Sequence, residues 1–405
     1  MNKIPDIPHD RVLPNGDFLA VSLKGEKISG ISLNAGYNHL GIEKFCESCN
    51  YNKNIHIFER LCGPGSCAQS IAFCQGAEMI AGIDIPQRAG YIRVIAAELE
   101  RIDNHLLQFA SLSHDIGFDT LSMYIRKDRE EVLDIAAMLF GNRIVFNINT
   151  IGGVRRDMDT SQADIIGKTL AYLEERDKYY LDLVTKENTL LIRLSGVGSL
   201  SSQNAARLCT VGPVARMANI SKDIRVDDPY AAYRYIPVSI VNNDRCDILG
   251  LVLVWLGEIR ESINIIRYAL DNLPDGEIKA PAPESIPCGE EFSRSEAPAG
   301  ENSCFIMANG TDIPERVKLT LPQFTNLPSL TSMLEGNYLA DLPLIINAVD
   351  LHYFGSGRTV VLNDIGNGRQ RIFNRQELRQ YSIDFYRQQG IDVNKVKVSK
   401  TPKNL

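Results

Sequence analysis

The sequence predicts an α+β protein that is mainly helical, with small antiparallel β elements at the N-terminus and after residue 300. Apolar residues recur three or four positions apart through most of the middle of the chain, which is typical of packed helices. They alternate with polar residues at 17–34 and 304–322, which is typical of hairpins. A chain of 405 residues, 44% hydrophobic and 23% charged, can bury a large core.

The first elements follow from turn and helix signals. Residues 1–36 are expected to hold a β hairpin whose turn begins at Gly25. Helical spacing begins at Ile42 and resumes over 68–81. Pro86 then begins a long helix, whose apolar residues form one stripe: Ile92, Ile95, Leu99, Ile102, Leu106 and Phe109.

The later elements are punctuated by proline and glycine. A loop is expected at 274–303, where five prolines interrupt the periodicity, and a hairpin at 304–322 around Asn309-Gly310. Further helices are predicted at 127–140, 160–185, 203–219 and 245–272. The chain thus divides into an N-terminal hairpin region, a helical core and a C-terminal extension: 1–36, 37–355 and 356–405.

Charge and hydropathy exclude several classes of partner and location. The net charge of −7 and the pI near 5.5 give no positive field for nucleic acid. The longest apolar stretch, Ile248 to Leu256, is far shorter than the roughly 20 residues that span a bilayer. No export signal is visible between Met1 and Asp17, and nine cysteines is an odd number for a disulfide framework. We therefore expect reduced thiols and a cytoplasmic location.

The densest group of reactive residues is a set of cysteines. Cys46 and Cys49 form one close pair, and Cys62 and Cys67 form another. Four thiolates in two pairs can bind zinc or an iron–sulfur cluster. However, Cys46 and Cys49 have helical spacing without the turn glycines of a metal-binding knuckle, so buried free thiols are the main expectation and a metal on all four is the alternative.

A glycine-rich turn leads directly into a helix beside the second pair. The run Cys62-Gly63-Pro64-Gly65-Ser66-Cys67 precedes the helical pattern, so that backbone N–H groups at the helix start are available to a bound group. Such a turn suits an anion or a cofactor.

This run resembles the first metal-binding segment of nickel–iron hydrogenase large subunits, in which Arg-x-Cys-Gly-x-Cys opens a helix. It also resembles the related 49 kDa-type large subunit of respiratory complex I, the NADH-quinone oxidoreductase. The resemblance covers most of the chain and points to the energy-converting, membrane-bound hydrogenase-related group. It rests on further ordered segments: 36–44, 86–106, 152–154, 211–213, 296–301, 336–343 and Asp350. It implies a helical bundle like that of a hydrogenase large subunit.

The chain departs from that family at the metal ligands. Hydrogenases hold nickel and iron with four thiolates, two from the first motif and two from a C-terminal pair. Cys62 matches the first of these, but Gly65, His352 and Gly355 stand at the other three positions. The resemblance thus implies that most nickel–iron ligands are missing, which argues against hydrogen cleavage.

The complex I branch uses the corresponding space as a pocket for the quinone headgroup. His39 matches that branch's histidine, but Gly63 stands at the position of its tyrosine. The resemblance implies an emptied metal cavity near five residues: His39, Cys62, Cys67, Asp350 and His352. A histidine with a pKa near 6.5 is a suitable proton donor for a two-electron, two-proton reduction.

These implications give a set of expected site residues. Catalytic roles are expected for His39, Cys62, Asp350 and His352. Contacts to the bound acceptor are expected from Gly63, Gly65 and Cys67. No cofactor held firmly by this chain is expected.

The resemblance implies the large, catalytic-type subunit of a membrane-associated, ion-translocating oxidoreductase complex. Electrons would come from iron–sulfur clusters of a small partner subunit and reduce a quinone or another small acceptor. Further hydrophilic electron-transfer subunits and membrane-arm subunits would complete the complex, and this chain would be peripheral on the inner face of the cell membrane. Two alternatives remain open, a non-catalytic scaffold subunit and a divergent nickel–iron hydrogenase.

Overall fold

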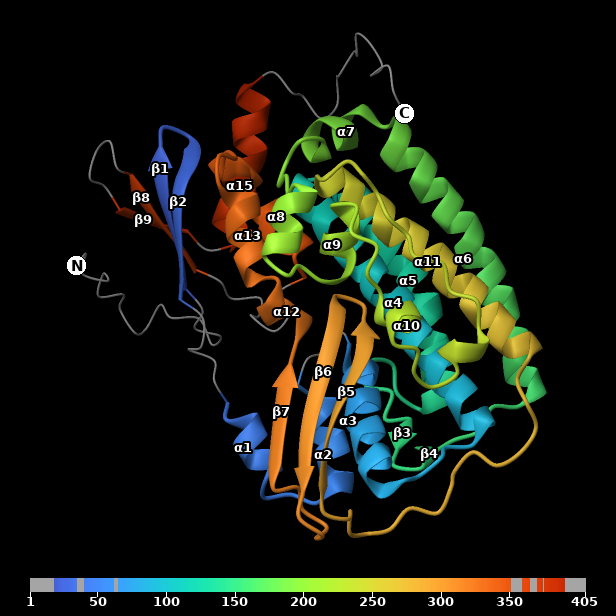
Figure 1. Ribbon diagram of the computed structural model, residues 1–405. Coiled ribbons are helices and arrows are strands. Elements are labelled where there is room, and N and C mark those ends of the chain that lie inside the picture. Colours follow the sequence, from blue (N-terminus) through green and yellow to red (C-terminus); the bar gives the residue numbers. More distant parts are fainter. Residues whose placement is uncertain are drawn as a thin grey trace.

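The computed structural model describes residues 18–34, 40–61, 65–350, 359–364, 370–373 and 375–389 (Figure 1). As the sequence predicts, the fold is α+β and mainly helical. The long helices are α4 (Gln87–Ile116), α5 (Asp119–Phe140), α6 (Thr160–Lys186) and α11 (Ile248–Asp271). They run side by side and form the body of the molecule (Figure 1).

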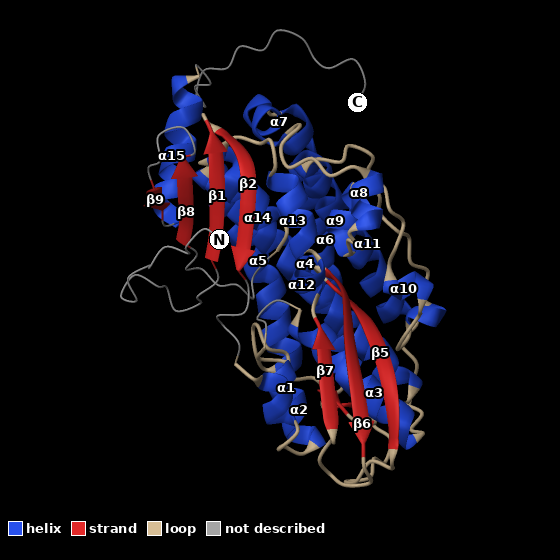
Figure 2. Cartoon of the chain, turned by 60° about the vertical axis from the view of Figure 1, so that its left-hand side comes forward, coloured by secondary structure: helices blue, strands red, loops and turns tan. Residues whose placement is uncertain are grey.

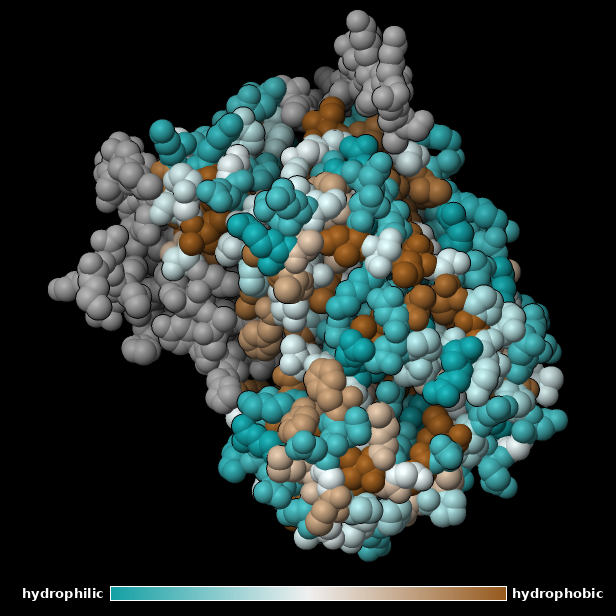
Figure 3. Space-filling view, in the orientation of Figure 1, coloured by the Kyte–Doolittle hydropathy of each residue, from teal (hydrophilic) through white to brown (hydrophobic). Residues whose placement is uncertain are grey.

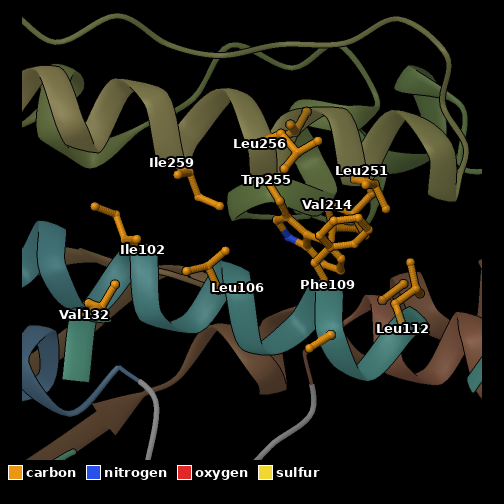
Figure 4. Close-up of a cluster of buried hydrophobic side chains, with 14 of the residues drawn as sticks. Ile102, Leu106, Phe109, Leu112, Val132, Val214, Leu251, Trp255, Leu256 and Ile259 are labelled. Atoms are coloured by element: carbon orange, nitrogen blue, oxygen red, sulfur yellow. The ribbon is translucent and has the colours of Figure 1, made fainter. Parts of the chain in front are cut away.

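Helix α4 lies at the centre of this bundle. Every residue from Ala89 to Leu106 is buried, because α5 and α11 pack along the helix and other elements cover its remaining faces. Its apolar stripe packs against α11, where Leu106 and Phe109 lie close to Trp255 and Ile259 (Figure 4). A helix that is covered all round must also bury its polar residues, and each of these needs a partner.

Sequence signals mark the ends of these helices. Helix α4 ends at Gly117 (φ 94°) and α5 at Gly141 (φ 76°), both in the left-handed conformation that glycine adopts at low cost. Asp159 begins α6 with a capping box in which its side chain accepts from Gln162 N–H. Asp247 begins α11 by accepting from Gly250 N–H.

The first sheet joins the two ends of the chain. Strands β1 (Phe18–Lys24) and β2 (Lys27–Asn34) form the expected hairpin. Strand β8 (Thr359–Asp364) then pairs with β1 in parallel, and β9 (Gln370–Phe373) completes the order β2-β1-β8-β9 (Figure 2). Helix α15 (Arg375–Gln388) follows. Part of the C-terminal extension therefore belongs to the same sheet as the N-terminal hairpin.

A second sheet of three antiparallel strands packs on α3 (Ser66–Ala81). Strands β6 (Gly300–Ala308) and β7 (Arg316–Thr320) confirm the hairpin expected after residue 300. Strand β5 (Gly289–Ala297) corrects the expected loop at 274–303, because the second half of that loop is in strands: Gly289–Ala297 is extended and paired with β6, which begins at Gly300. Two of the strand residues that face α3, Ser293 and Ser295, are small and polar and donate to carbonyl oxygens of that helix. The sequence of β5 therefore does not show the alternation of apolar and polar residues by which a strand is usually predicted.

The predicted helix at 203–219 is also corrected, since it is two short helices, α8 (Ser202–Arg207) and α9 (Gly212–Met217). Cys209 (φ 52°) and Gly212 (φ 66°) have left-handed backbones at this break. The break lets the backbone at Gly212 approach Ala299 closely, because a Cβ on Gly212 would lie 2.3 Å from Ala299 O.

The remaining described elements are short and connect these units. They are α1 (Ile42–Cys46), α2 (Tyr51–Phe58), β3 (Asn149–Thr150), β4 (Gly153–Val154), α7 (Asn188–Leu194), α10 (Ile224–Asp227), the 3₁₀ turns Tyr233–Tyr235 and Leu339–Asp341, α12 (Pro322–Thr325), α13 (Leu327–Leu334) and α14 (Leu342–Ala348).

The surface over the second sheet mixes polar and apolar residues (Figure 3). Phe292 is 54% exposed on β5, opposite Phe305 of β6. Among the helices of the described ranges, none has the length and apolar composition needed to cross a membrane.

Candidate active site

Four of the expected site residues lie outside the described residues: His39, Cys62, Gly63 and His352. The structure places the other three, Gly65, Cys67 and Asp350, which are close to Cys62 and His352 in sequence. These three residues and the groups that they contact define the site.

The start of α3 is held by a carboxylate of α4. Gly65 precedes the helix with φ 88°, and Ser66 Oγ donates to Glu100 Oε1 at 2.8 Å. The backbone N–H groups of Cys67 and Ala68 donate to the same carboxylate at 2.9 and 3.3 Å. The donors that the sequence offers to a bound anion are thus taken by Glu100, which fixes the exit of the glycine-rich turn.

Asp350 is held by the same helix two turns further on. It follows α14 in the left-handed conformation (φ 54°) and is 7% exposed. Its carboxylate accepts from Asn104 Nδ2 at 3.2 Å and from Gln108 Nε2 at 2.5 Å. Two amide donors therefore fix the point at which the chain leaves α14 towards His352.

These contacts bring two distant segments to one face of α4. Residues Glu100, Asn104 and Gln108 are spaced by four, so they lie on one face of the helix, about 6 Å apart per step. The start of α3 and the end of α14 therefore approach this face within about 12 Å of each other along the helix. We define the α4 site as Gly65 to Ala68, the face of Glu100, Asn104 and Gln108, and Asp350.

Burial decides the protonation of the α4 site. Removal from water raises the pKa of Glu100 to about 7, against the lowering effect of its hydrogen bonds from Cys67, Ser66 and Ala68; Asp103 adds a smaller upward effect. Burial and the nearby Glu100 raise the pKa of the Cys67 thiol well above its usual range. The Cys67 thiol therefore stays protonated at neutral pH, and the pKa of Glu100 lies close to neutral pH.

Sequence reasoning missed Glu100, Gln108 and the role of Asn104. The sequence predicts only the apolar stripe of the long helix and assigns no partners to the polar residues that lie off it. The pattern that could have identified Glu100, Asn104 and Gln108 is their spacing at i, i+4 and i+8, which places them on one face of a helix whose other residues are nearly all buried. The oxygen of the Asn104 amide is buried, and no described residue donates to it.

The cysteines do not gather into a metal site within the described part of the chain, where no group of three or more His, Cys, Asp or Glu side chains is arranged to hold an ion. Cys46 packs in an apolar cluster with Tyr51 and Phe73, whereas Cys67 belongs to the main core. Burial raises the pKa of Cys46 to about 12. These thiols have the environment of core residues.

A cleft lies at the other end of α3 from the α4 site. It has a volume of about 490 Å³ and is lined in part by Glu78, Arg93 and Tyr235. Arg93 and Glu78 form a bidentate pair at 2.6 and 3.0 Å, and Gly152 N–H also donates to Glu78, so this pair fixes β4 against α4.

The fold and site define a mainly helical α+β protein whose buried polar site is assembled from segments far apart in sequence. Comparison with known families matches residues 115–287 and 282–356 to the 49 kDa subunit of the respiratory-chain NADH dehydrogenase. The chain belongs to this family, and its relatives are oxidoreductase subunits.

Three relatives illustrate the range of the family. The carbon monoxide-induced hydrogenase of Rhodospirillum rubrum is 34% identical over 349 residues, which cover 86% of this chain and 96% of that protein. The alpha subunit of the membrane-bound hydrogenase of Pyrococcus furiosus is 32% identical over 398 residues, 94% and 92% of the two chains. A subunit of the NADH-quinone oxidoreductase of Dehalococcoides mccartyi is 34% identical over 336 residues, 82% and 92% of the two chains.

Proposed function

We propose that this chain is the catalytic-type large subunit of a membrane-associated, ion-translocating oxidoreductase complex. It receives electrons from an iron–sulfur subunit and reduces a quinone or another small acceptor at the α4 site. The observation that carries the proposal is the convergence of the glycine-rich turn and of Asp350 on Glu100, Asn104 and Gln108.

The location of the complex is part of the proposal. One relative is named a membrane-bound hydrogenase subunit and another an NADH-quinone oxidoreductase subunit. Since no described helix is long and apolar enough to cross a membrane, other subunits would anchor this chain to the inner face of the membrane. Ion translocation would likewise belong to those membrane-arm subunits.

Two of the described residues, Gly65 and Cys67, argue against a nickel–iron centre. Gly65 stands where the family's second thiolate is expected and has no side chain to donate. Cys67 is buried beside the Glu100 carboxyl group, which favours the thiol over the thiolate that binds metal. We therefore assign no step to such a centre and assign the α4 site to an organic acceptor.

The chain's own groups would orient the acceptor and supply its protons. The Glu100 carboxyl group and the Asn104 amide oxygen lie on the buried face of α4. Asp350 leads into the segment of His352, and His39 matches the family's histidine. A proton donor with a pKa near the working pH suits a two-electron, two-proton reduction.

The test is turnover of the purified, assembled complex with a water-soluble quinone analogue. Asp350→Asn keeps the size of the side chain but removes its charge, and we expect turnover to fall by about 100-fold or more because the segment of His352 loses its anchor. The matched control is Asp228→Asn, whose side chain is 54% exposed and pairs with Arg294 at the surface. It should leave turnover unchanged.

Two outcomes would contradict the proposal. If His39→Ala, Cys62→Ala and Asp350→Asn all leave assembly and turnover unchanged, this chain is a scaffold and the acceptor is reduced elsewhere. If elemental analysis finds about one nickel per complex and hydrogen is evolved, the chain is a divergent hydrogenase.

A further inference from the structure

A group of ionisable side chains is buried beside the α4 site, and the reaction as proposed above assigns a role to none of them. It joins residues of α4, α9, α10, α11, β5 and the segment before α10, and every member is at most 2% exposed. We call it the buried charge cluster: Glu98, Arg101, Arg216, Asp223, Arg225, Glu258 and Glu296.

The charges of the cluster do not balance when all its groups are ionised. It holds three guanidinium groups, which stay protonated in proteins, and four carboxyl groups. An unpaired buried charge is costly, so the balanced state has three carboxylates and one carboxylic acid.

Three of the carboxyl groups have strong cationic partners. Glu98 accepts from Arg225 Nη1 at 3.1 Å and from Arg101 Nε at 3.2 Å, with two hydroxyl donors in addition. Asp223 accepts twice from Arg225, at 2.7 and 3.0 Å. Glu258 accepts from Arg216 Nε at 2.6 Å and faces His105 Nε2 at 2.8 Å.

Glu296 has the weakest set of partners. Its Oε1 accepts from Arg216 Nη1 at 2.9 Å, but this nitrogen also donates to Lys222 O and lies 3.4 Å from Asp223. Among the described residues, its Oε2 accepts only the backbone N–H of Ile224, at 3.2 Å. The extra proton of the cluster therefore belongs on Glu296.

The groups around Glu296 agree with this assignment. Burial, and then the charge of Asp223, raise the pKa of Glu296 to about 7, while Arg216, Arg101 and Arg225 act in the opposite direction. From the loop after α10, Tyr230 faces the backbone of Glu296, whose N–H donates to the hydroxyl oxygen at 3.1 Å.

His105 is the other group that could take the proton. Burial lowers its pKa, and Arg101 and Arg216 lower it further, against the effect of Glu258. Its Nδ1 is buried and has no acceptor among the described residues.

Glu296 lies opposite a partly exposed residue of the neighbouring strand and next in the chain to a residue that contacts the α4 site. On the neighbouring strand Glu301 is directly opposite it in the register, with its side chain 21% exposed and paired with Lys222 at 2.7 Å and Arg294 at 3.7 Å. Facing side chains on paired strands lie about 5 Å apart at Cβ. On the inner side, the following residues Ala297 and Pro298 pack on Gly65, where a Cβ would lie 3.7 Å from Ala297 Cβ.

We propose that Glu296 is the proton-carrying group of the buried charge cluster, holding one proton at rest and exchanging it with solvent by way of Glu301. The use of this proton rests on the proposed function. The acceptor takes two electrons from the iron–sulfur subunit and two protons; Glu296 gives up one of these protons and becomes a carboxylate. A proton from solvent, passed through Glu301, restores the acid, and the second proton comes from solvent.

Infrared spectroscopy of the purified complex at pH 6 tests the resting proton directly. The C=O band of a buried carboxylic acid should shift in D₂O, and Glu296→Gln should remove one such component, whereas Glu290→Gln, at an exposed position of the same strand, should remove none. Glu301→Gln should slow the shift in D₂O. Absence of a component specific to Glu296, or exchange unaffected by Glu301→Gln, would overturn the proposal.

Unfolding of the variants provides a second measurement in case one of them assembles poorly. Because Gln resembles the neutral acid, Glu296→Gln should leave the urea midpoint of the chain unchanged at pH 6, whereas Glu98→Gln should lower it. Equal losses in the two variants would mean that Glu296 is an ordinary ionised partner of Arg216, and would overturn the proposal.

The role in turnover is tested by the pH profile of acceptor reduction. Glu296→Gln should lower kcat and remove the fall in kcat that the wild-type complex shows as the pH rises through about 7. Glu296→Asp should restore both kcat and this pH dependence in part. A variant with the wild-type profile would refute this role. If the wild-type complex reduces no acceptor, the proposed function fails, while the infrared component still decides whether Glu296 holds the proton.

Discussion

Replacing Glu98 by Gln tests how much the ionised core contributes to stability. The Glu98 carboxylate is fully buried and accepts from Arg225, Arg101, Tyr233 and Ser262. Gln has nearly the same shape but no charge, so the variant leaves the buried Arg101 guanidinium without the carboxylate that it pairs with.

The magnitude follows from the pKa of the carboxyl group. Despite burial, Arg225 and Arg101 lower the pKa of Glu98 from 4.5 to about 2. Each pKa unit corresponds to about 1.4 kcal/mol, so the ionised form contributes about 3 kcal/mol to folding. Because the pKa in the folded state is lowered, this contribution is complete above pH 4.5 and is lost as the pH falls from 4.5 to 2.

The assay is urea unfolding of the purified chain, followed by the fluorescence of its single tryptophan. Trp255 is 2% exposed and stacks on His105 with ring centroids 6.4 Å apart, so it reports the core next to the cluster. At pH 7 we expect Glu98→Gln to lose about 3 kcal/mol, and at pH 3 clearly less. The control Asp182→Asn breaks an exposed pair with Lys186 and should cost under about 1 kcal/mol. Equal losses at both pH values, or no loss, would refute the reasoning.

Three further predictions use the same unfolding assay. Gly212→Ala should lower the free energy of unfolding by more than about 2 kcal/mol, since its φ is 66° and its Cβ would lie 2.3 Å from a carbonyl oxygen. The control Gly167→Ala lies in a helix, where its Cβ would meet nothing within 4 Å, and should cause no loss. Equal losses in the two variants would contradict this prediction. Burial raises the pKa of Glu100 to about 7. The free energy of unfolding of wild type should therefore fall by up to about 3 kcal/mol relative to that of Glu100→Gln as the pH rises from 4.5 to 7. If the difference in free energy of unfolding between the two proteins does not change with pH, the pKa of Glu100 is not raised. Asp128→Ala should lower the free energy of unfolding by about 3 kcal/mol, because the side chains of Tyr172 and Arg176 each donate to this buried carboxylate at 2.6 Å. A loss below about 1 kcal/mol would mean that water takes the place of the carboxylate as their hydrogen-bond acceptor.

Local patterns predicted the elements whose apolar residues face one core. The hairpin at 17–34, the helices at 160–185 and 245–272 and the hairpin after residue 300 are confirmed, because their spacing and their turn or capping residues agree. Helix α4 was located correctly, but the burial of its polar residues was not predicted. An apolar stripe shows which face packs first and does not show that neighbouring elements cover the polar face as well.

Long-range pairing accounts for what the sequence did not predict. Strand β5 lacks an apolar alternation because Ser293 and Ser295 hydrogen-bond to α3, and the parallel pairing of β1 with β8 joins segments more than 300 residues apart. In the site, Gly65, Cys67 and Asp350 were named from the resemblance, and the structure adds the helix face that holds them. Glu100 escaped notice because its partners, the N–H groups at the start of α3, are more than 30 residues away.

A density map of the assembled complex, frozen during reduction of a quinone analogue, tests the central claim most directly. We expect an organic headgroup between the glycine-rich turn, Asn104 and Asp350, no metal ion there, and an iron–sulfur cluster of a neighbouring subunit facing it. A dinuclear metal centre at that place, or side chains that fill it with no cluster-bearing subunit nearby, would contradict the claim.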